Sequence, residues 1–122
     1  MKIAIDIDGT ITYCPEFFKK LTNLFFNNSE IHIITARSDN YDANTIKELE
    51  ELNIKYHFIY FGFDKMNYVI DKGIEIVFED MDEFSNNMPK NVTVFKIREE
   101  FNFNWIENKW VYSDKTGINI DK

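Results

Sequence analysis

The first residues of the chain place two carboxylates directly after a short apolar stretch. Residues 3–5 have the composition of a buried strand, Asp6 and Asp8 follow it, and Gly9 and Thr10 come next. In an extended chain, residues two apart project to the same side, so these carboxylates repel each other unless a cation lies between them. A carboxylate nucleophile beside a second acid can transfer a phosphoryl group through an acyl phosphate. The competing interpretation is an ordinary Asp-Gly turn at the end of a strand.

Further polar side chains stand at corresponding places along the chain. Thr35 follows the second apolar run, Lys65 opens the helix predicted after the third, and Glu79 and Asp80 end the fourth. Because the carboxyl ends of parallel strands share one edge of a sheet, we expect these side chains to lie near Asp6. A lysine in the first turn of a helix opposes the helix dipole, which indicates an anion nearby. The alternatives are a surface lysine, a solvated acidic loop and a threonine bonded to its own backbone.

The elements that must position these residues alternate between strands and helices. The expected strands cover residues 3–5, 31–34, 56–60, 74–78 and 92–95, and the expected helices cover 15–26, 41–52 and 65–72, with a short turn to 87. In the second helix, the spacing places Ile46, Leu49 and Leu52 on the sheet-facing side. This alternation predicts an α/β protein with a three-layer, Rossmann-like parallel sheet.

The whole chain, residues 1–122, is expected to form a single domain, because its length suits one core and no linker or repeat divides it. No inserted cap domain fits in the stretch of about half a dozen residues between Asp8 and the first predicted helix. Residues 101–122 are rich in aromatic side chains and are expected to pack on the domain as a C-terminal extension. The alternative is that they form a dimer surface or a partial lid. Within them, residues 110–112 are predicted as a last strand and residues 114–117 as a turn.

The composition excludes several classes of partner. The net charge is -7 and lysine and arginine form no run, so a nucleic-acid partner is not expected. No apolar run reaches the length of a membrane span, which argues against a membrane partner. The one cysteine, Cys14, cannot form an internal disulfide. With no recognisable signal peptide, these features predict a cytoplasmic protein.

Taken together, the motifs resemble the haloacid dehalogenase-like (HAD) phosphohydrolase superfamily. The opening signature DxDGT is present as residues 6–10, a threonine follows the second strand as Thr35, and the third motif lysine is Lys65. The acidic pair of the fourth motif is Glu79-Asp80. The four motifs occur in the family's order over about 80 residues.

The resemblance implies a role for each of the polar residues. Asp6 would be the nucleophile and Asp8 the general acid and base. Thr35, Ala36 and Lys65 would hold the phosphoryl group. The second Asp of the signature is absent from dehalogenases, so its presence favours phosphoryl chemistry over dehalogenation.

The resemblance also implies a bound Mg²⁺, which agrees with the preference of this ion for hard oxygen ligands. The ligands would be the Asp6 carboxylate, the backbone carbonyl of Asp8 and the Asp80 carboxylate. The family's usual acidic pair is Asp-Asp, so Glu79 departs from the pattern and is an additional candidate ligand.

We therefore expect a Mg²⁺-dependent phosphatase that cleaves phosphomonoesters. The sequence does not name its substrate, and nucleotides, sugar phosphates, phosphorylated polymers and protein phosphates all remain open. Family members without a cap act on large or exposed phosphates or borrow a lid from a neighbouring subunit, so a homo-oligomer is one alternative. Another is a non-enzymatic phospho-acceptor of the receiver type, or a binding module with the same acidic pocket. For Arg37 we expect contact with a substrate anion, or a surface ion pair with Asp39 or Asp42.

Overall fold

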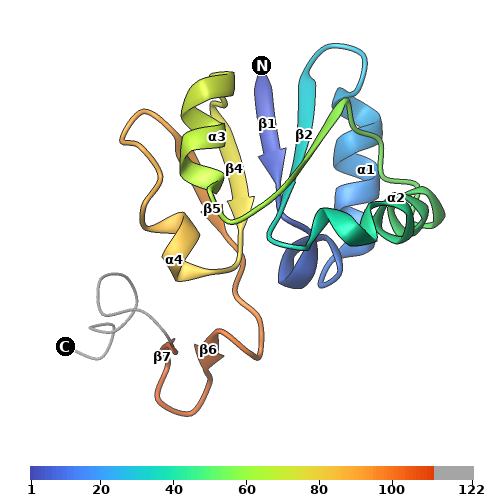
Figure 1. Cartoon of the computed structure of the whole chain (residues 1–122). Coiled ribbons are helices and arrows are strands. Elements are labelled where there is room, and N and C mark those ends of the chain that lie inside the picture. The colour runs from blue at the N-terminus through green and yellow to red at the C-terminus, as the bar shows by residue number, and fades with distance from the viewer. Residues whose placement is uncertain (112–122) are drawn as a thin grey trace.

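The computed structural model describes residues 1–111 and has a five-stranded parallel sheet at its centre (Figure 1). The strands are β1 Lys2–Ile5, β2 Glu30–Thr35, β3 Phe58–Phe61, β4 Ile76–Glu79 and β5 Thr93–Lys96. Their order across the sheet is β3-β2-β1-β4-β5, and each neighbouring pair is parallel. The α/β class predicted from the sequence is confirmed, and β1 takes the central position.

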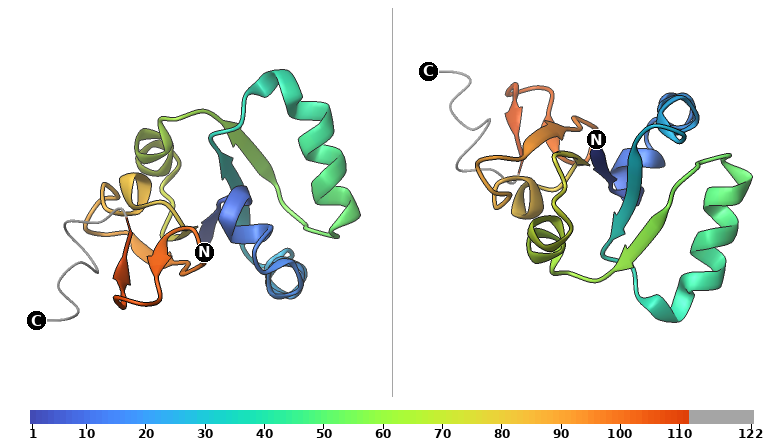
Figure 2. Two further views of the ribbon diagram at one scale, coloured as in Figure 1. Left: turned by 90° about the horizontal axis from the view of Figure 1, so that it is seen from below. Right: turned by 90° about the horizontal axis from the view of Figure 1, so that it is seen from above.

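Helices cover both faces of this sheet (Figure 2). They are α1 Pro15–Phe25, α2 Asp42–Glu51, α3 Lys65–Lys72 and the single-turn α4 Asp82–Ser85, with short helical turns at Ile7–Ile11 and Asp39–Tyr41. The three layers are compatible with a Rossmann-like fold. Within residues 1–111, no helix combines the length and the apolar character needed to cross a membrane.

The central strand is apolar on both sides because both sides are covered. Ile3 and Ile5 join the core beneath α1 and α2, where they lie in one buried cluster with Phe18. Ala4, between them, points to the opposite face and joins the cluster that contains Val69 of α3. Alternate residues of a strand point to opposite faces, so the continuous apolar run encodes a strand that is buried from both directions.

Local signals set the bounds of the helices. Pro15 opens α1, where the missing N–H costs nothing because it would have no partner inside the helix. The Asp64 carboxylate accepts a hydrogen bond from the Asn67 N–H and caps α3. Gly73 ends α3 with a φ of 68°, a conformation that glycine adopts without strain.

Three details of the prediction were wrong. The fourth strand begins at Ile76 and not at Ile74. The third strand begins at Phe58 and not at Tyr56, because the His57 side chain accepts a hydrogen bond from the Ile31 N–H and the ladder with β2 starts only after it. On α2, Ile46 is 39% exposed, whereas Thr45 and Leu49 are buried. The buried positions of α2 are four residues apart, and Ile46 lies about 100° around the helix from Thr45.

The chain beyond β5 forms a small antiparallel hairpin of β6 Phe103–Asn104 and β7 Lys109–Trp110, beyond the carboxyl ends of the strands (Figure 1). Phe103 is buried, and the Arg98 guanidinium lies over its ring and over that of Trp105. This part of the predicted extension therefore packs against the chain that leaves β5. Tyr112, expected to end the last strand, and the predicted turn at 114–117 lie outside the described residues.

His32 lies at the centre of β2 and predicts a pH dependence of stability. It is 1% exposed, with its ring nitrogens 2.7 Å from the Tyr68 hydroxyl and 2.6 Å from Glu30 Oε1. Burial lowers the pKa of His32 despite the neighbouring Glu30. Below about pH 6.5 the unfolded chain therefore binds a proton that the folded chain does not, and stability falls as the pH drops through that value.

Chemical denaturation at pH 5 to 7 will test this prediction. We expect the unfolding free energy of the wild type to fall more steeply towards pH 5 than that of His32→Gln. Equal slopes for the two proteins would show that His32 does not contribute.

Candidate functional site

The site begins in the turn that follows β1. Asp8 has an extended backbone, and Gly9 takes a φ of 78°, so the chain leaves the strand without forming a regular helix. The turn is closed by a hydrogen bond from the Thr12 N–H to the Ile7 carbonyl, 3.1 Å long. Ile7 is buried in the core beneath α1 and α2, while Asp6 and Asp8 stay at the edge of the sheet.

Lys65 connects the first and fourth strands through its ammonium group. Its Nζ lies 2.9 Å from Asp6 Oδ1 and 2.7 Å from Glu79 Oε1. All three side chains are buried, and Lys65 itself is 1% exposed. Burial alone lowers the pKa of Lys65, but the two carboxylates outweigh it and the pKa is raised, so the ammonium stays charged. The anion expected near the first turn of α3 is thus a pair of carboxylates.

Glu79 is fully engaged with its neighbours. One carboxylate oxygen accepts from Lys65, and the other accepts from the backbone N–H groups of Asp80 and Met81, at 3.0 and 3.2 Å. Burial and the nearby Asp6 raise the pKa of Glu79. This carboxylate therefore orients Lys65 and the backbone after β4, and it retains little capacity for a further ligand.

Asp80 is the acid of this cluster that forms no ion pair among the described residues. It is 5% exposed, and its Oδ1 has no hydrogen-bond partner among the described residues. Burial, followed by the carboxylate of Asp6, raises the pKa of Asp80 to about 9. A Cβ atom placed on Gly9 would lie 2.2 Å from Asp80 Oδ2, so only glycine admits this carboxylate.

These acids fit a divalent cation. Asp6, Glu79 and Asp80 each offer an oxygen atom, and the three atoms lie within 4.8 Å of one another. The unpartnered oxygen of Asp80 is what a site for a hard cation leaves when the cation is removed. Glu79 already accepts three hydrogen bonds and Asp6 accepts two, so Asp6 and Asp80 are the better candidates for ligands.

Asp8 lies outside the buried cluster and pairs with Arg37. Arg37 Nε donates to Asp8 Oδ2 at 2.9 Å, and Nη2 donates to Oδ1 at 2.7 Å. The hydrogen bonds from Arg37 lower the pKa of Asp8, despite partial burial. The ion pair suggested for Arg37 with Asp39 or Asp42 was wrong: the guanidinium turns the other way, to Asp8 and to Glu48 of α2.

Thr35 and Ala36 lie at the end of β2, on the same edge of the sheet. The Thr35 side chain is buried, and its hydroxyl accepts a hydrogen bond of 3.1 Å from the Arg37 N–H. The assignment of Thr35 and Ala36 to binding of the phosphoryl group stays a prediction, and so do the catalytic roles of Asp6 and Asp8.

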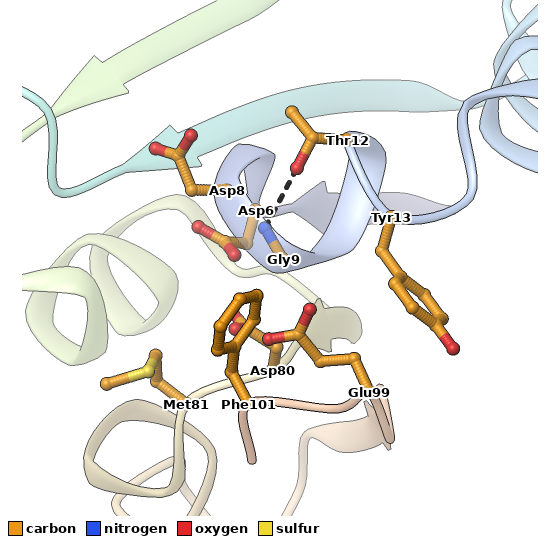
Figure 3. A pocket seen from close by; sticks show the side chains of 9 residues that line it. All are labelled: Asp6, Asp8, Gly9, Thr12, Tyr13, Asp80, Met81, Glu99 and Phe101. Atoms are coloured by element: carbon orange, nitrogen blue, oxygen red, sulfur yellow. Dashed lines mark hydrogen bonds between the residues drawn. The ribbon is translucent and has the colours of Figure 1, made fainter.

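A pocket of about 500 Å³ opens above the acids. Figure 3 shows the side chains that line it, which are those of Asp6, Asp8, Gly9, Thr12, Tyr13, Asp80, Met81, Glu99 and Phe101. Lys65 is not in the lining, because it lies behind Asp6 and Glu79. At the rim, Tyr13 is 50% exposed and Phe101 is 78% exposed.

The sequence analysis gave no role to several residues of this region, among them Thr10, Glu99 and Asn102. Thr10 donates a hydrogen bond of 3.0 Å to Asp6 Oδ2, Glu99 lines the pocket, and the Asn102 amide donates to the backbone carbonyl of Asp80 at 2.9 Å. Glu99 could have been predicted from the sequence, since it follows the fifth strand and should lie at the same edge of the sheet as the other acids. For Asn102 the sequence carried no signal, because its side chain bonds only to backbone atoms, of Glu99, Ile97 and Asp80, and a backbone partner leaves no mark on residue type.

Comparisons with known proteins add no further constraint to this geometry. No family model matches the chain, and no curated protein matches it either.

The buried ion cluster predicts a large effect on stability. Lys65→Met leaves Asp6 and Glu79 buried without their cation, which should lower the unfolding free energy by about 3–5 kcal/mol. Combining Lys65→Met with Glu79→Gln removes one of the uncompensated charges and should recover part of the loss. Urea denaturation of both variants measures this, and a double variant no more stable than the single one would contradict the assigned pairing.

The raised pKa of Asp80 predicts that Mg²⁺ competes with a proton. Binding requires an ionised carboxylate, so the affinity for Mg²⁺ should increase from pH 7 to pH 9 by at most about tenfold per unit. Isothermal titration in buffers of different ionisation enthalpy should show proton release on binding. Asp80→Asn should abolish the pH dependence, while Asp71→Asn, an exposed control on α3, should keep it. Affinity that does not change with pH would contradict the prediction.

Proposed function

We propose that this protein is a Mg²⁺-dependent phosphatase of the HAD-like type, which hydrolyses phosphomonoesters through an aspartyl-phosphate on Asp6. The observation that carries the proposal is the convergence of Asp6, Lys65 and Asp80 at one edge of the sheet. Lys65 Nζ is 2.9 Å from Asp6, and Asp80 is within reach of a cation shared with Asp6. An open pocket gives a substrate access to this edge.

In the first half-reaction Asp6 is the nucleophile. One of its oxygens forms a bond to phosphorus, the bond from phosphorus to the ester oxygen breaks, and the leaving oxygen takes a proton from Asp8. Lys65 and Thr10 hold the two Asp6 oxygens in place through hydrogen bonds of 2.9 and 3.0 Å. This fixes the carboxylate before the substrate arrives, so little reorganisation is needed at the moment of attack.

In the second half-reaction the phosphoryl group passes to water. Asp8 takes a proton from the water, the new oxygen–phosphorus bond forms, and the bond to Asp6 breaks to regenerate the free carboxylate. Arg37 favours the ionised form of Asp8, which suits the role of Asp8 as the base in this step, and the Asp8 side chain is 63% exposed at the mouth of the pocket. The proton that Asp8 gains here is the one that it gives to the leaving oxygen of the next substrate.

Asp6, Asp80 and the backbone carbonyl of Asp8 would hold the Mg²⁺. When bound, the ion neutralises phosphoryl charge and orients the group for in-line attack. The chain needs such a cation, since the pocket is lined by the carboxylates of Asp6, Asp8, Asp80 and Glu99 and would otherwise repel a phosphate.

The rim of the pocket favours one substrate class among those expected. Tyr13 and Phe101 expose aromatic side chains beside the acids, and aromatic side chains bind planar groups by stacking. A phosphoester with a planar leaving group, such as a nucleotide, uses this rim better than a sugar phosphate does. The described residues contain no cap over the pocket, which also suits a large or exposed phosphate.

The receiver-type alternative is less well supported. Such a module would carry its phospho-acceptor aspartate at the end of the third strand, but β3 ends at Phe61 and is followed by Gly62. The acidic cluster is built instead on β1 and β4.

Release of phosphate from p-nitrophenyl phosphate tests the proposal. We expect turnover with Mg²⁺, its loss in EDTA and its recovery on adding Mg²⁺ again. Asp6→Asn should reduce turnover to background, and Asp8→Asn should reduce it by about 10²–10⁴-fold through loss of proton transfer. Asp71→Asn replaces an exposed aspartate of α3 and should be fully active.

Activity that survives in Asp6→Asn would contradict the assigned nucleophile. A stable acyl-phosphate on the wild-type protein without turnover would favour the phospho-acceptor alternative.

A further inference from the structure

Arg37 forms hydrogen bonds with residues of three different elements, which are the turn after β1, the end of β2 and α2. Its Nε and Nη2 reach the two oxygens of Asp8, and its Nη1 donates to Glu48 Oε1 at 2.8 Å and to Thr45 Oγ1 at 3.3 Å. Its backbone N–H donates to the hydroxyl of Thr35. The side chain is 23% exposed, so this pairing is partly shielded from water.

The Asp8 side chain needs such a partner to keep one orientation. It is the exposed residue of a mostly buried turn, next to Gly9, and its carboxylate is the most exposed of the acids named as reacting groups or metal ligands. A planar guanidinium that donates one hydrogen bond to each oxygen fixes the carboxylate plane as well as its position. Each oxygen keeps a second lone pair, so Asp8 can still exchange a proton with a group in the pocket.

Glu48 in turn fixes Arg37. Glu48 lies on α2, which contributes no residue to the lining of the pocket. Between Asp8 and Glu48 the guanidinium already faces two carboxylates, so its charge is more than balanced. Binding a substrate phosphate would require it to release one of them, which argues against the substrate contact expected from the sequence.

We propose that Arg37 is a positioning residue, which fixes the Asp8 carboxylate for proton transfer and is itself oriented by Glu48. The inference rests on the proposed phosphatase function. Through Glu48, α2 then affects proton transfer in a pocket that this helix does not line.

Kinetics of Arg37→Lys, Arg37→Ala and Glu48→Gln will test it. Lysine keeps the charge but cannot donate a hydrogen bond to each oxygen of Asp8 in one plane. Arg37→Lys should therefore lower kcat by about 10–100-fold, with KM changed by less than about threefold. Glu48→Gln should show a smaller loss of the same kind. Added guanidinium at low millimolar concentration should restore part of the activity of Arg37→Ala, and an equal concentration of NaCl should not.

The choice of substrate provides a second readout. An alkyl phosphate needs a proton on its leaving oxygen, whereas p-nitrophenolate leaves without one, so the loss in Arg37→Lys should be larger on the alkyl phosphate. Lys2→Ala removes a surface ion pair at the other end of β1 and should match the wild type on both substrates. Thermal melting checks that each variant is folded.

Several results would overturn the inference. Wild-type kcat in Arg37→Lys, or a raised KM with unchanged kcat, would return Arg37 to a surface or substrate-binding role. An equal loss on both substrates without rescue by guanidinium would assign it a structural role only. A wild-type protein without turnover would contradict the proposed function and remove the inference with it, whereas active wild type and fully active variants would contradict the inference alone.

Discussion

The structure depends on one buried ammonium group between two buried carboxylates. Lys65 opens α3, Asp6 follows β1 and Glu79 ends β4, so their contacts fix a helix and two adjacent strands relative to one another. Removing three charges from water is costly, and only close pairing with additional hydrogen bonds offsets that cost. Glu79 supplies such bonds by accepting two backbone N–H groups, which also sets the path of the chain into Asp80.

Three cations near the sheet edge pair with neighbouring acids. Lys65 pairs with Asp6 and Glu79, Arg37 pairs with Asp8 and Glu48, and Lys96 at the end of β5 pairs with Asp82. Asp80 is left over, buried and with an oxygen that no described residue contacts by a hydrogen bond. Burial, followed by the neighbouring carboxylate of Asp6, raises its pKa to about 9. The ion pairs and the raised pKa of Asp80 thus both follow from the burial of several acids at one edge of the sheet.

The chain beyond β5 completes the pocket. Asn102 accepts from the Glu99 N–H and donates to the carbonyls of Asp80 and Ile97, so one buried amide ties the extension to the end of β4. This brings Glu99 into the lining and Phe101 to the rim. A domain that ended with its fifth strand would lack this wall, which explains why an extension of aromatic and amide residues belongs to the site.

The sequence by itself determined the alternation of strands and helices and the edge at which Asp6, Lys65 and Asp80 meet. It could do so because hydrophobic periodicity is local, and because parallel strands bring their carboxyl ends together wherever each lies in the chain. Only the tertiary structure decided which charges pair, that Arg37 faces Asp8 and not its neighbours in sequence, and which side of α2 is buried. Long side chains reach several partners, and the choice among them depends on distances between elements that no local pattern records.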